Sequence, residues 1–195
     1  MSARREPSGP AGMVLFPGAG SDADHPALRA IAAAVAPIPT ARVDFPYRRA
    51  GRRAPDRAPV LLACVRDSAT AFAAEHGFGT DRLVLGGRSM GGRMCSMVIA
   101  EGFPAAGLVL IGYPLHPPGR PERLRVAHLP RLTAPCLFVH GTRDPFATQA
   151  ELTTWTATIP GPVTHVWIDG GRHDLAGADA RVAQAVVDWC AALNV

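Results

Sequence analysis

The sequence contains no lysine, and all 20 of its basic residues are arginines. Together with its many alanine, glycine and proline residues, this absence is typical of high-GC coding and excludes no function. Cysteine is scarce as well: the four cysteines are widely spaced and form no C-x-x-C pair. Neither a disulfide framework nor a cysteine metal site is therefore predicted, and their apolar surroundings are typical of reduced core cysteines in an intracellular protein.

Long hydrophobic runs are also absent. The first apolar run covers only residues 13–16, which is too short for a secretion signal or a membrane span. We therefore expect a cytoplasmic protein with no membrane partner. The 195 residues suffice for one buried core, and they show no repeat or linker. We expect a flexible segment over residues 1–12 and a single domain over residues 13–195.

Positive charge is in moderate excess, with a formal net charge of +4. The basic residues cluster mainly between Tyr47 and Arg53, where they could bind a nucleic acid or another anionic surface. No nucleic-acid-binding motif accompanies them, so we expect a solvated loop and no nucleic-acid partner. Contact between the substrate and an arginine of residues 48–53 stays open at this point.

Short apolar segments alternate with helical patterns along the chain. The predicted strands cover residues 13–16, 41–45, 83–85, 107–111, 136–139 and 163–168. This alternation predicts an α/β fold, a three-layer sandwich whose mostly parallel sheet of about six strands is covered by helices on both faces. Ligands bind beyond the carboxyl ends of such strands, so we expect the loops after strands to carry the chemistry.

A serine flanked by glycines follows the third predicted strand. Residues Gly87 to Gly91 read G-R-S-M-G, which fits the G-x-S-x-G pattern of a nucleophile elbow. The two glycines leave room for neighbouring backbone, and the setting between a strand and a helix makes the pattern more specific. We expect Ser89 to be a nucleophile held above the end of the sheet.

A serine hydroxyl needs a base, and that base needs an orienting acid. Two later loops supply these groups, because Asp144 and His173 each follow a predicted strand by a few residues. We predict a catalytic triad of Ser89, His173 and Asp144. Asp169 and Asp174 are alternatives for the orienting role, although either could simply make a local hydrogen bond.

The remaining parts of an acyl-transfer site are predicted from position. An oxyanion hole needs two backbone N–H groups, for which we choose Met90, directly after the nucleophile, and Ala19, in the loop after the first strand. Gly20 is the second choice for that donor and a candidate for lining the substrate pocket. Tyr113 and His116 are further lining candidates because they follow a strand end, with a rigid proline loop as the alternative.

These motifs resemble the α/β-hydrolase fold, and more narrowly the small dienelactone-hydrolase-like proteins. The order serine, acid, base is that of the α/β-hydrolases. The resemblance implies a hydrolase acting on an ester-like or other acyl bond. The mechanism of such a triad needs no metal or organic cofactor, and we expect none. Because the chain reaches the oxyanion strand almost directly, we expect a minimal sandwich with little or no cap. Pro17-Gly18 departs from the His-Gly of many members. The resemblance is carried by residues 15–21, 45–48, 86–93, 112–115, 140–144 and 170–174.

The expected activity is that of a serine hydrolase with an acyl-enzyme intermediate. A carboxylesterase, a thioesterase or a dienelactone-hydrolase-like enzyme fits, acting on a small acyl substrate as a monomer or homodimer. A catalytically silent scaffold with a binding or regulatory role is the alternative. Arg88 and Arg93 flank the nucleophile and could attract an anionic substrate, although salt bridges to nearby carboxylates are the more common fate of such arginines.

Overall fold

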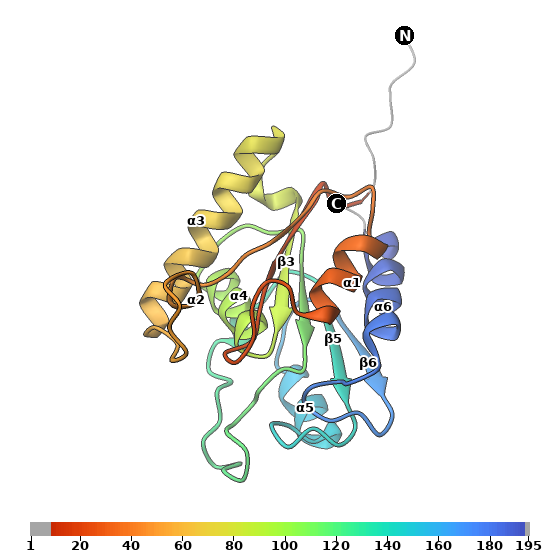
Figure 1. The fold of residues 1–195 in the computed structure, drawn as a ribbon. Helices are drawn as coiled ribbons and strands as arrows, with labels where there is room; N and C mark the ends of the chain where they lie inside the picture. The colour runs from red at the N-terminus through yellow and green to blue at the C-terminus, as the bar shows by residue number, and fades with distance from the viewer. Residues whose placement is uncertain (1–8, 194–195) are drawn as a thin grey trace.

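A six-stranded parallel sheet forms the centre of the computed structural model, which describes residues 9–193. The strand order is β2-β1-β3-β4-β5-β6, and every neighbouring pair is parallel. In Figure 1 the arrows of β3, β5 and β6 all point the same way. The predicted fold class is confirmed. Residues 1–8 of the predicted flexible segment lie outside the described residues. The strands are β1 (Gly12–Phe16), β2 (Thr40–Arg42), β3 (Leu83–Arg88), β4 (Gly107–Ile111), β5 (Cys136–Gly141) and β6 (Val163–Ile168).

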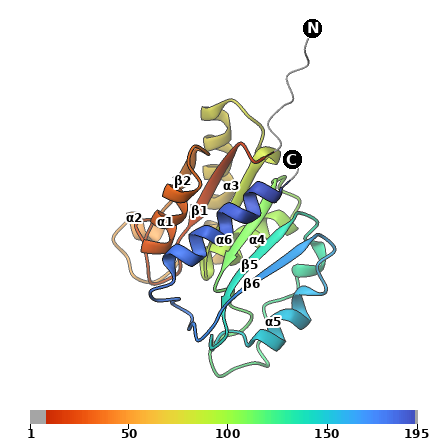
Figure 2. The ribbon, with the colours of Figure 1, turned by 90° about the vertical axis from the view of Figure 1, so that its right-hand side faces the viewer.

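Helices cover both faces of the sheet. Figure 2 shows α6 and α1 lying in front of the strands, while α3 and α4 lie behind them. Within residues 9–193, no helix combines the length and hydrophobicity needed to span a bilayer. The helices are α1 (Pro26–Ala34), α2 (Pro46–Arg49), α3 (Ala58–His76), α4 (Met90–Ala100), α5 (Gln149–Thr156) and α6 (Asp179–Ala192), with short 3-10 helices η1 (Thr80–Arg82) and η2 (Leu129–Arg131).

The central strands are apolar throughout because helices cover both of their faces. In β1, Met13 and Leu15 pack into the core under α1 and α6, whereas Val14 and Phe16 pack into the core under α3 and α4. All four side chains are fully buried. This double burial explains why the strands appear in the sequence as short continuous apolar runs rather than as alternating patterns.

The order in which successive strands join the sheet reverses between β1 and β3. The chain leaves β1 through α1 to reach β2 on one side, and then returns through α3 to β3 on the other side of β1. The loops after β1 and β3 therefore diverge at the carboxyl edge of the sheet, which is where open α/β sheets bind ligands. Residues 17–20 and Ser89 lie at this point.

The segment after β2 differs from its prediction. The strand predicted over residues 41–45 ends at Arg42, and α2 begins at Pro46 and covers the start of the segment predicted as a loop, residues 47–53. Proline favours the first position of a helix because its fixed φ is already helical and its missing N–H is not needed there. Tyr47 is consequently turned inward and fully buried, while Arg49 stays exposed.

Candidate active site

Ser89 lies in a strained turn between β3 and α4. Its φ of 50° and ψ of −115° are rarely adopted by a residue with a side chain. Such a conformation costs about 1–3 kcal/mol and persists only where its surroundings hold it. The Ser89 N–H donates to the Ile111 carbonyl at 2.8 Å, and the Ser89 carbonyl accepts from Arg93 N–H at 3.0 Å. The turn is therefore fixed on both sides.

Two glycines allow this turn to sit against the end of β1. A Cβ atom on Gly87 or on Gly91 would collide with the Phe16 carbonyl oxygen. A larger residue at either position would have to push the elbow away from β1, because the obstructing atom belongs to the backbone. The glycines of the motif thus bring Ser89 next to the loop that follows β1.

The structure brings Ser89, His173 and Asp144 into one hydrogen-bonded chain. His173 Nε2 lies 2.9 Å from Ser89 Oγ, and His173 Nδ1 lies 2.8 Å from Asp144 Oδ2. An ionised carboxylate only accepts hydrogen bonds, so Nδ1 carries the proton and Nε2 is free to accept from the serine hydroxyl. This is the arrangement in which a histidine can act as a base toward serine.

Asp144 is held in place from several sides. Its side chain is fully buried, and Oδ1 accepts a hydrogen bond from Phe146 N–H at 2.8 Å. The Phe146 ring stacks on the imidazole of His173 with the ring centroids 3.9 Å apart. The alternative acids face elsewhere: Asp169 accepts from Thr142 Oγ1, and Asp174 accepts from Ala176 N–H.

His140 is a buried neighbour of the hydrogen-bonded triad, and the sequence did not reveal its role. Its Nε2 donates to the Ala147 carbonyl at 3.0 Å and lies 3.5 Å from Asp144 Oδ2. Burial lowers the pKa of His140, which favours a neutral ring. A neutral His140 leaves the negative charge of Asp144 to orient His173.

Arg88 fixes the loop that carries the histidine. Its Nη2 donates to the His173 carbonyl at 3.0 Å, and its guanidinium lies beside Gly18. Burial lowers the pKa of Arg88, although a guanidinium stays charged at any physiological pH. Arg88 therefore links the loop after β6 to the loop after β1.

The predicted oxyanion donors border the same space. Met90 is the first residue of α4, so its N–H has no partner within the helix. The Ala19 carbonyl accepts a hydrogen bond from Tyr47 Oη at 2.9 Å, which sets the orientation of the loop after β1. The buried Tyr47 thus connects the Phe-Pro-Tyr segment to the site. The identity of the second donor, Ala19 or Gly20, stays a prediction.

These groups open into a cleft of about 530 Å³. Ser89, His173, Met90, Ala19 and Gly20 all line it. The remaining wall is formed by apolar side chains and charged groups, namely Pro55, Asp56, Ala58, Leu61, Arg88, Arg93, Met94, Pro114, Arg125 and Phe146.

Tyr113 and His116 lie outside the lining of this cleft, contrary to their predicted place. Gly112, with a φ of 57°, turns the chain after β4, and the Tyr113 ring packs edge-on against Phe138 in the core. His116 is buried too, with Nδ1 donating to the Pro117 carbonyl at 2.9 Å. The turn at Gly112 leads the chain inward, and of residues 113–116 only Pro114 borders the cleft.

A second serine–histidine pair lies in the core. Ser96 Oγ is 2.8 Å from His128 Nε2, and Tyr113 Oη is 3.0 Å from the same nitrogen. Ser96 is fully buried in α4 and borders no cleft with the triad, and among residues 9–193 His128 forms no ion pair with a carboxylate. The cluster of Ser96, Tyr113 and His128 satisfies buried polar groups rather than forming a nucleophile.

The buried histidine of this cluster should make stability depend on pH. Burial, with Arg93 and Arg131 nearby, lowers the pKa of His128 from 6.5 to about 4. Between these values the unfolded chain binds a proton that the folded chain does not, so stability is lost as the pH falls. From pH 7 to pH 5 this amounts to about 2 kcal/mol. Urea unfolding at pH 7 and pH 5 measures this loss of unfolding free energy. The loss in the wild type should exceed the loss in H128Q by about 2 kcal/mol, and equal losses in the two proteins would contradict the prediction.

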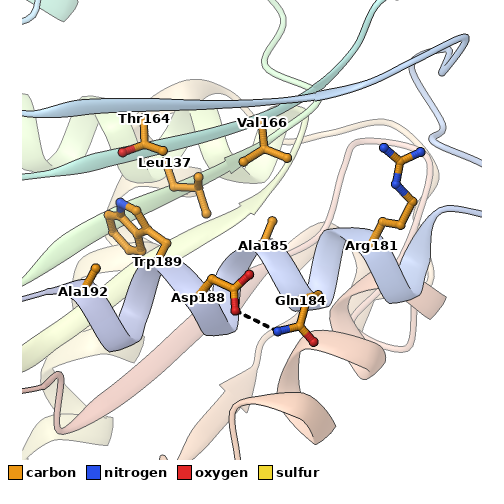
Figure 3. Close-up of a pocket in the computed structure, with 9 residues that line it drawn as sticks. All are labelled: Leu137, Thr164, Val166, Arg181, Gln184, Ala185, Asp188, Trp189 and Ala192. Carbon is orange, nitrogen blue, oxygen red and sulfur yellow. Dashed lines mark hydrogen bonds between the residues drawn. The ribbon is translucent and has the colours of Figure 1, made fainter.

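Another hollow of about 510 Å³ lies between α6 and strands β5 and β6. Figure 3 shows Leu137 and Val166 pointing toward Ala185 and Trp189 of α6. It shares no lining residue with the cleft at Ser89. The triad and the predicted oxyanion donors therefore lie at the carboxyl edge of the sheet, and none of these residues lines the hollow at α6.

Comparison with known proteins shows a common fold. A family model described as an alpha/beta hydrolase domain matches residues 10–189. A dienelactone hydrolase from Anabaena variabilis has a TM-score of 0.75 and 22% identity, covering 97% of this chain and 89% of its own. Est1E from Butyrivibrio proteoclasticus has a TM-score of 0.72 and 16% identity, covering 95% of this chain and 89% of its own. An alpha-beta serine hydrolase homologue from Coxiella burnetii has a TM-score of 0.74 and 15% identity, covering 95% of this chain and 88% of its own.

Proposed function

Because the chain belongs to the alpha/beta hydrolase domain family, we propose that it is a serine hydrolase cleaving an ester-like acyl bond. The observation that carries this proposal is the continuous chain of hydrogen bonds from Ser89 Oγ through His173 to Asp144. The strained elbow adds support, since strain of this kind concentrates at functional sites.

In the first step Ser89 Oγ attacks the carbonyl carbon of the substrate. His173 Nε2 takes the hydroxyl proton as the new C–O bond forms, and Asp144 stabilises the resulting imidazolium. The carbonyl oxygen becomes negative and accepts hydrogen bonds from Met90 N–H and from the loop amide at Ala19. The positive end of α4 points at the same place and favours that charge.

The intermediate collapses by breaking the bond to the leaving group. His173 returns its proton to the leaving oxygen or sulfur, and the acyl group stays on Ser89. A water molecule then gives its proton to His173 and attacks the acyl carbon. Collapse of this second intermediate releases the acid and restores the serine hydroxyl, so the residues end unchanged.

The cleft supports a small acyl substrate. Its volume of about 530 Å³ is in the range of small-molecule sites. The proline-rich segment, residues 113–135, contributes only Pro114 and Arg125 to its lining. Carboxylester, thioester and lactone bonds all suit this mechanism. We place the enzyme in the cytoplasm because its four cysteines are free and buried. Three expectations stay predictions: that residues 13–195 form a single domain, that the protein is a monomer or homodimer, and that it has no nucleic-acid partner.

Hydrolysis of p-nitrophenyl esters of graded chain length tests the proposal. The wild type should release nitrophenol well above the uncatalysed rate from at least the short acyl esters, and Ser89→Ala should remove that activity. A folded wild-type protein that hydrolyses neither these esters nor the matching thioesters would contradict the proposal and favour the silent scaffold.

A further inference from the structure

Three arginines line the cleft at Ser89, namely Arg88, Arg93 and Arg125. Among residues 9–193, none of the three forms an ion pair. Arg88 is occupied by the His173 carbonyl. The guanidinium groups of Arg93 and Arg125 form no hydrogen bond within the described part of the chain, which leaves two cations facing the cleft.

Arg93 is the more enclosed of the two. Its Nε is buried without a hydrogen-bond partner, and burial lowers the pKa of the guanidinium. The charged or polar groups around it are Arg125, which opposes its charge, the phenol of Tyr113, and the imidazole of His128, whose lowered pKa favours the neutral ring. Burying a cation beside a second cation is costly unless an anion compensates it. The described residues supply no such anion.

Arg125 is held at the cleft by its backbone. Its N–H donates to the Leu115 carbonyl at 2.7 Å, which ties the proline-rich segment to the strand end. The residue is partly buried. This anchoring keeps Arg125 beside Arg93 although the two charges repel each other.

Other arginines of the chain do find carboxylates. Arg48 pairs with Asp22 at 3.4 Å, and Arg52 pairs with Asp56 at 2.7 Å. Asp56 is the one carboxylate on the lining of the cleft. Its Oδ1 binds Arg52 and its Oδ2 is buried without a hydrogen-bond partner, and neither oxygen forms an ion pair with Arg93 or Arg125. Two of the four arginines of residues 48–53 are thus paired with carboxylates, and the exposed Arg49 and Arg53 lie outside the lining of the cleft. Arg93 and Arg125 are the unpaired arginines that lie next to the nucleophile.

We propose that Arg93 and Arg125 bind an anionic group, a carboxylate or a phosphate, carried by the acyl substrate; this subsite rests on the proposed function of Ser89. Two planar guanidinium forks suit the oxygens of either anion. Arg93 follows Ser89 by four residues, which is about 6 Å along a helix. Only a few bonded atoms of the substrate are therefore needed between the anionic group and the scissile carbonyl. The positive charge of the cleft attracts such a substrate from solution.

Two matched substrate pairs separate the possible sources of the anion. The p-nitrophenyl monoester of adipic acid places a carboxylate on the acyl side, and the ester of adipamic acid is its neutral match. Hexanoyl phosphopantetheine places a phosphate on the leaving-group side, and hexanoyl pantetheine is its neutral match. The anionic member of at least one pair should have a kcat/KM roughly 10- to 100-fold higher. R93Q and R125Q should each reduce that ratio about tenfold or more.

The exposed Arg123, on the same segment but outside the cleft, provides the matched control. R123Q should leave the ratio unchanged at the same ionic strength. Equal kcat/KM for both members of both pairs in the wild type, or an equal reduction of the ratio by R123Q, would overturn the subsite. Measuring the ratio rather than the rate separates anion recognition from a general loss of folding.

Calorimetric titration of the Ser89→Ala protein distinguishes failure of the subsite from failure of the proposed function. The probes are the monoethyl ester of adipic acid and ethyl adipamate. Binding of the anionic probe only, lost with R93Q, supports the subsite even if no ester is hydrolysed. Hydrolysis of neutral esters without any preference for the carboxylate or the phosphate substrate would retain the serine hydrolase and reject the anion subsite.

Discussion

Ser89→Ala should lower kcat on any ester that the wild type cleaves by about 10⁴-fold or more, as loss of the nucleophile does in other triads. The variant keeps Cβ, the elbow and the hydrogen bonds of the turn, so only the attacking oxygen is lost. Without that oxygen, His173 and Asp144 have no nucleophile to activate. Only substrate binding and the oxyanion donors then still contribute to catalysis. Steady-state release of nitrophenol, corrected for the uncatalysed rate, measures the effect.

Ser96→Ala is the matched control for this prediction. Ser96 is the buried serine of α4, and it also lies within hydrogen-bond distance of a histidine. Its removal should cost about 1–3 kcal/mol of stability by leaving buried partners unsatisfied. Its kcat should stay within a few-fold of the wild type. A large fall in kcat with S96A and none with S89A would reverse the assignment of the nucleophile.

Asp144→Asn should lower kcat by about 10³- to 10⁴-fold while leaving the fold intact, in line with the loss seen when a triad aspartate is replaced in the same way. Asp144 Oδ1 accepts from Phe146 N–H, and Oδ2 faces His173. In asparagine the single carbonyl oxygen stays with Phe146 N–H, which turns the NH₂ group toward Nδ1. The imidazole proton then moves to Nε2, and the ring can no longer accept the Ser89 proton.

Asp174→Asn provides the matched control, since Asp174 neighbours the base in sequence and only caps a local turn through Ala176 N–H. Its kcat should remain close to that of the wild type. Both variants are compared by kcat on the same ester and by thermal unfolding. An active D144N protein beside an inactive D174N protein would show that the wrong carboxylate has been assigned.

Much of the site could be predicted because its parts obey local rules. The elbow is encoded by Gly87 and Gly91, whose missing side chains are required by the Phe16 carbonyl. Asp144 and His173 were identifiable because parallel strands end at one edge of the sheet, so loops far apart in sequence meet there. The same reasoning gave the sheet and the helices on both of its faces.

Features that depend on side-chain direction could not be predicted. Tyr113 and His116 follow a strand end as site residues do, but the positive φ of Gly112 turns them into the core. The position of His140 depends on packing, which places its Nε2 3.5 Å from Asp144 Oδ2. Which arginines find carboxylates is likewise decided by tertiary contacts, so the unpaired Arg93 became visible only in the structure.

Labelling with a fluorophosphonate probe tests the central claim most directly, because the probe phosphonylates only a serine activated by a working base. Ser89 Oγ displaces fluoride from the probe, so the wild type should gain the mass of one probe less HF, and fragmentation of the labelled peptide should place the adduct on Ser89. Labelling should disappear in S89A, fall steeply in D144N and persist in S96A. A folded wild-type protein that stays unlabelled, or that carries the label on another residue, would contradict the account.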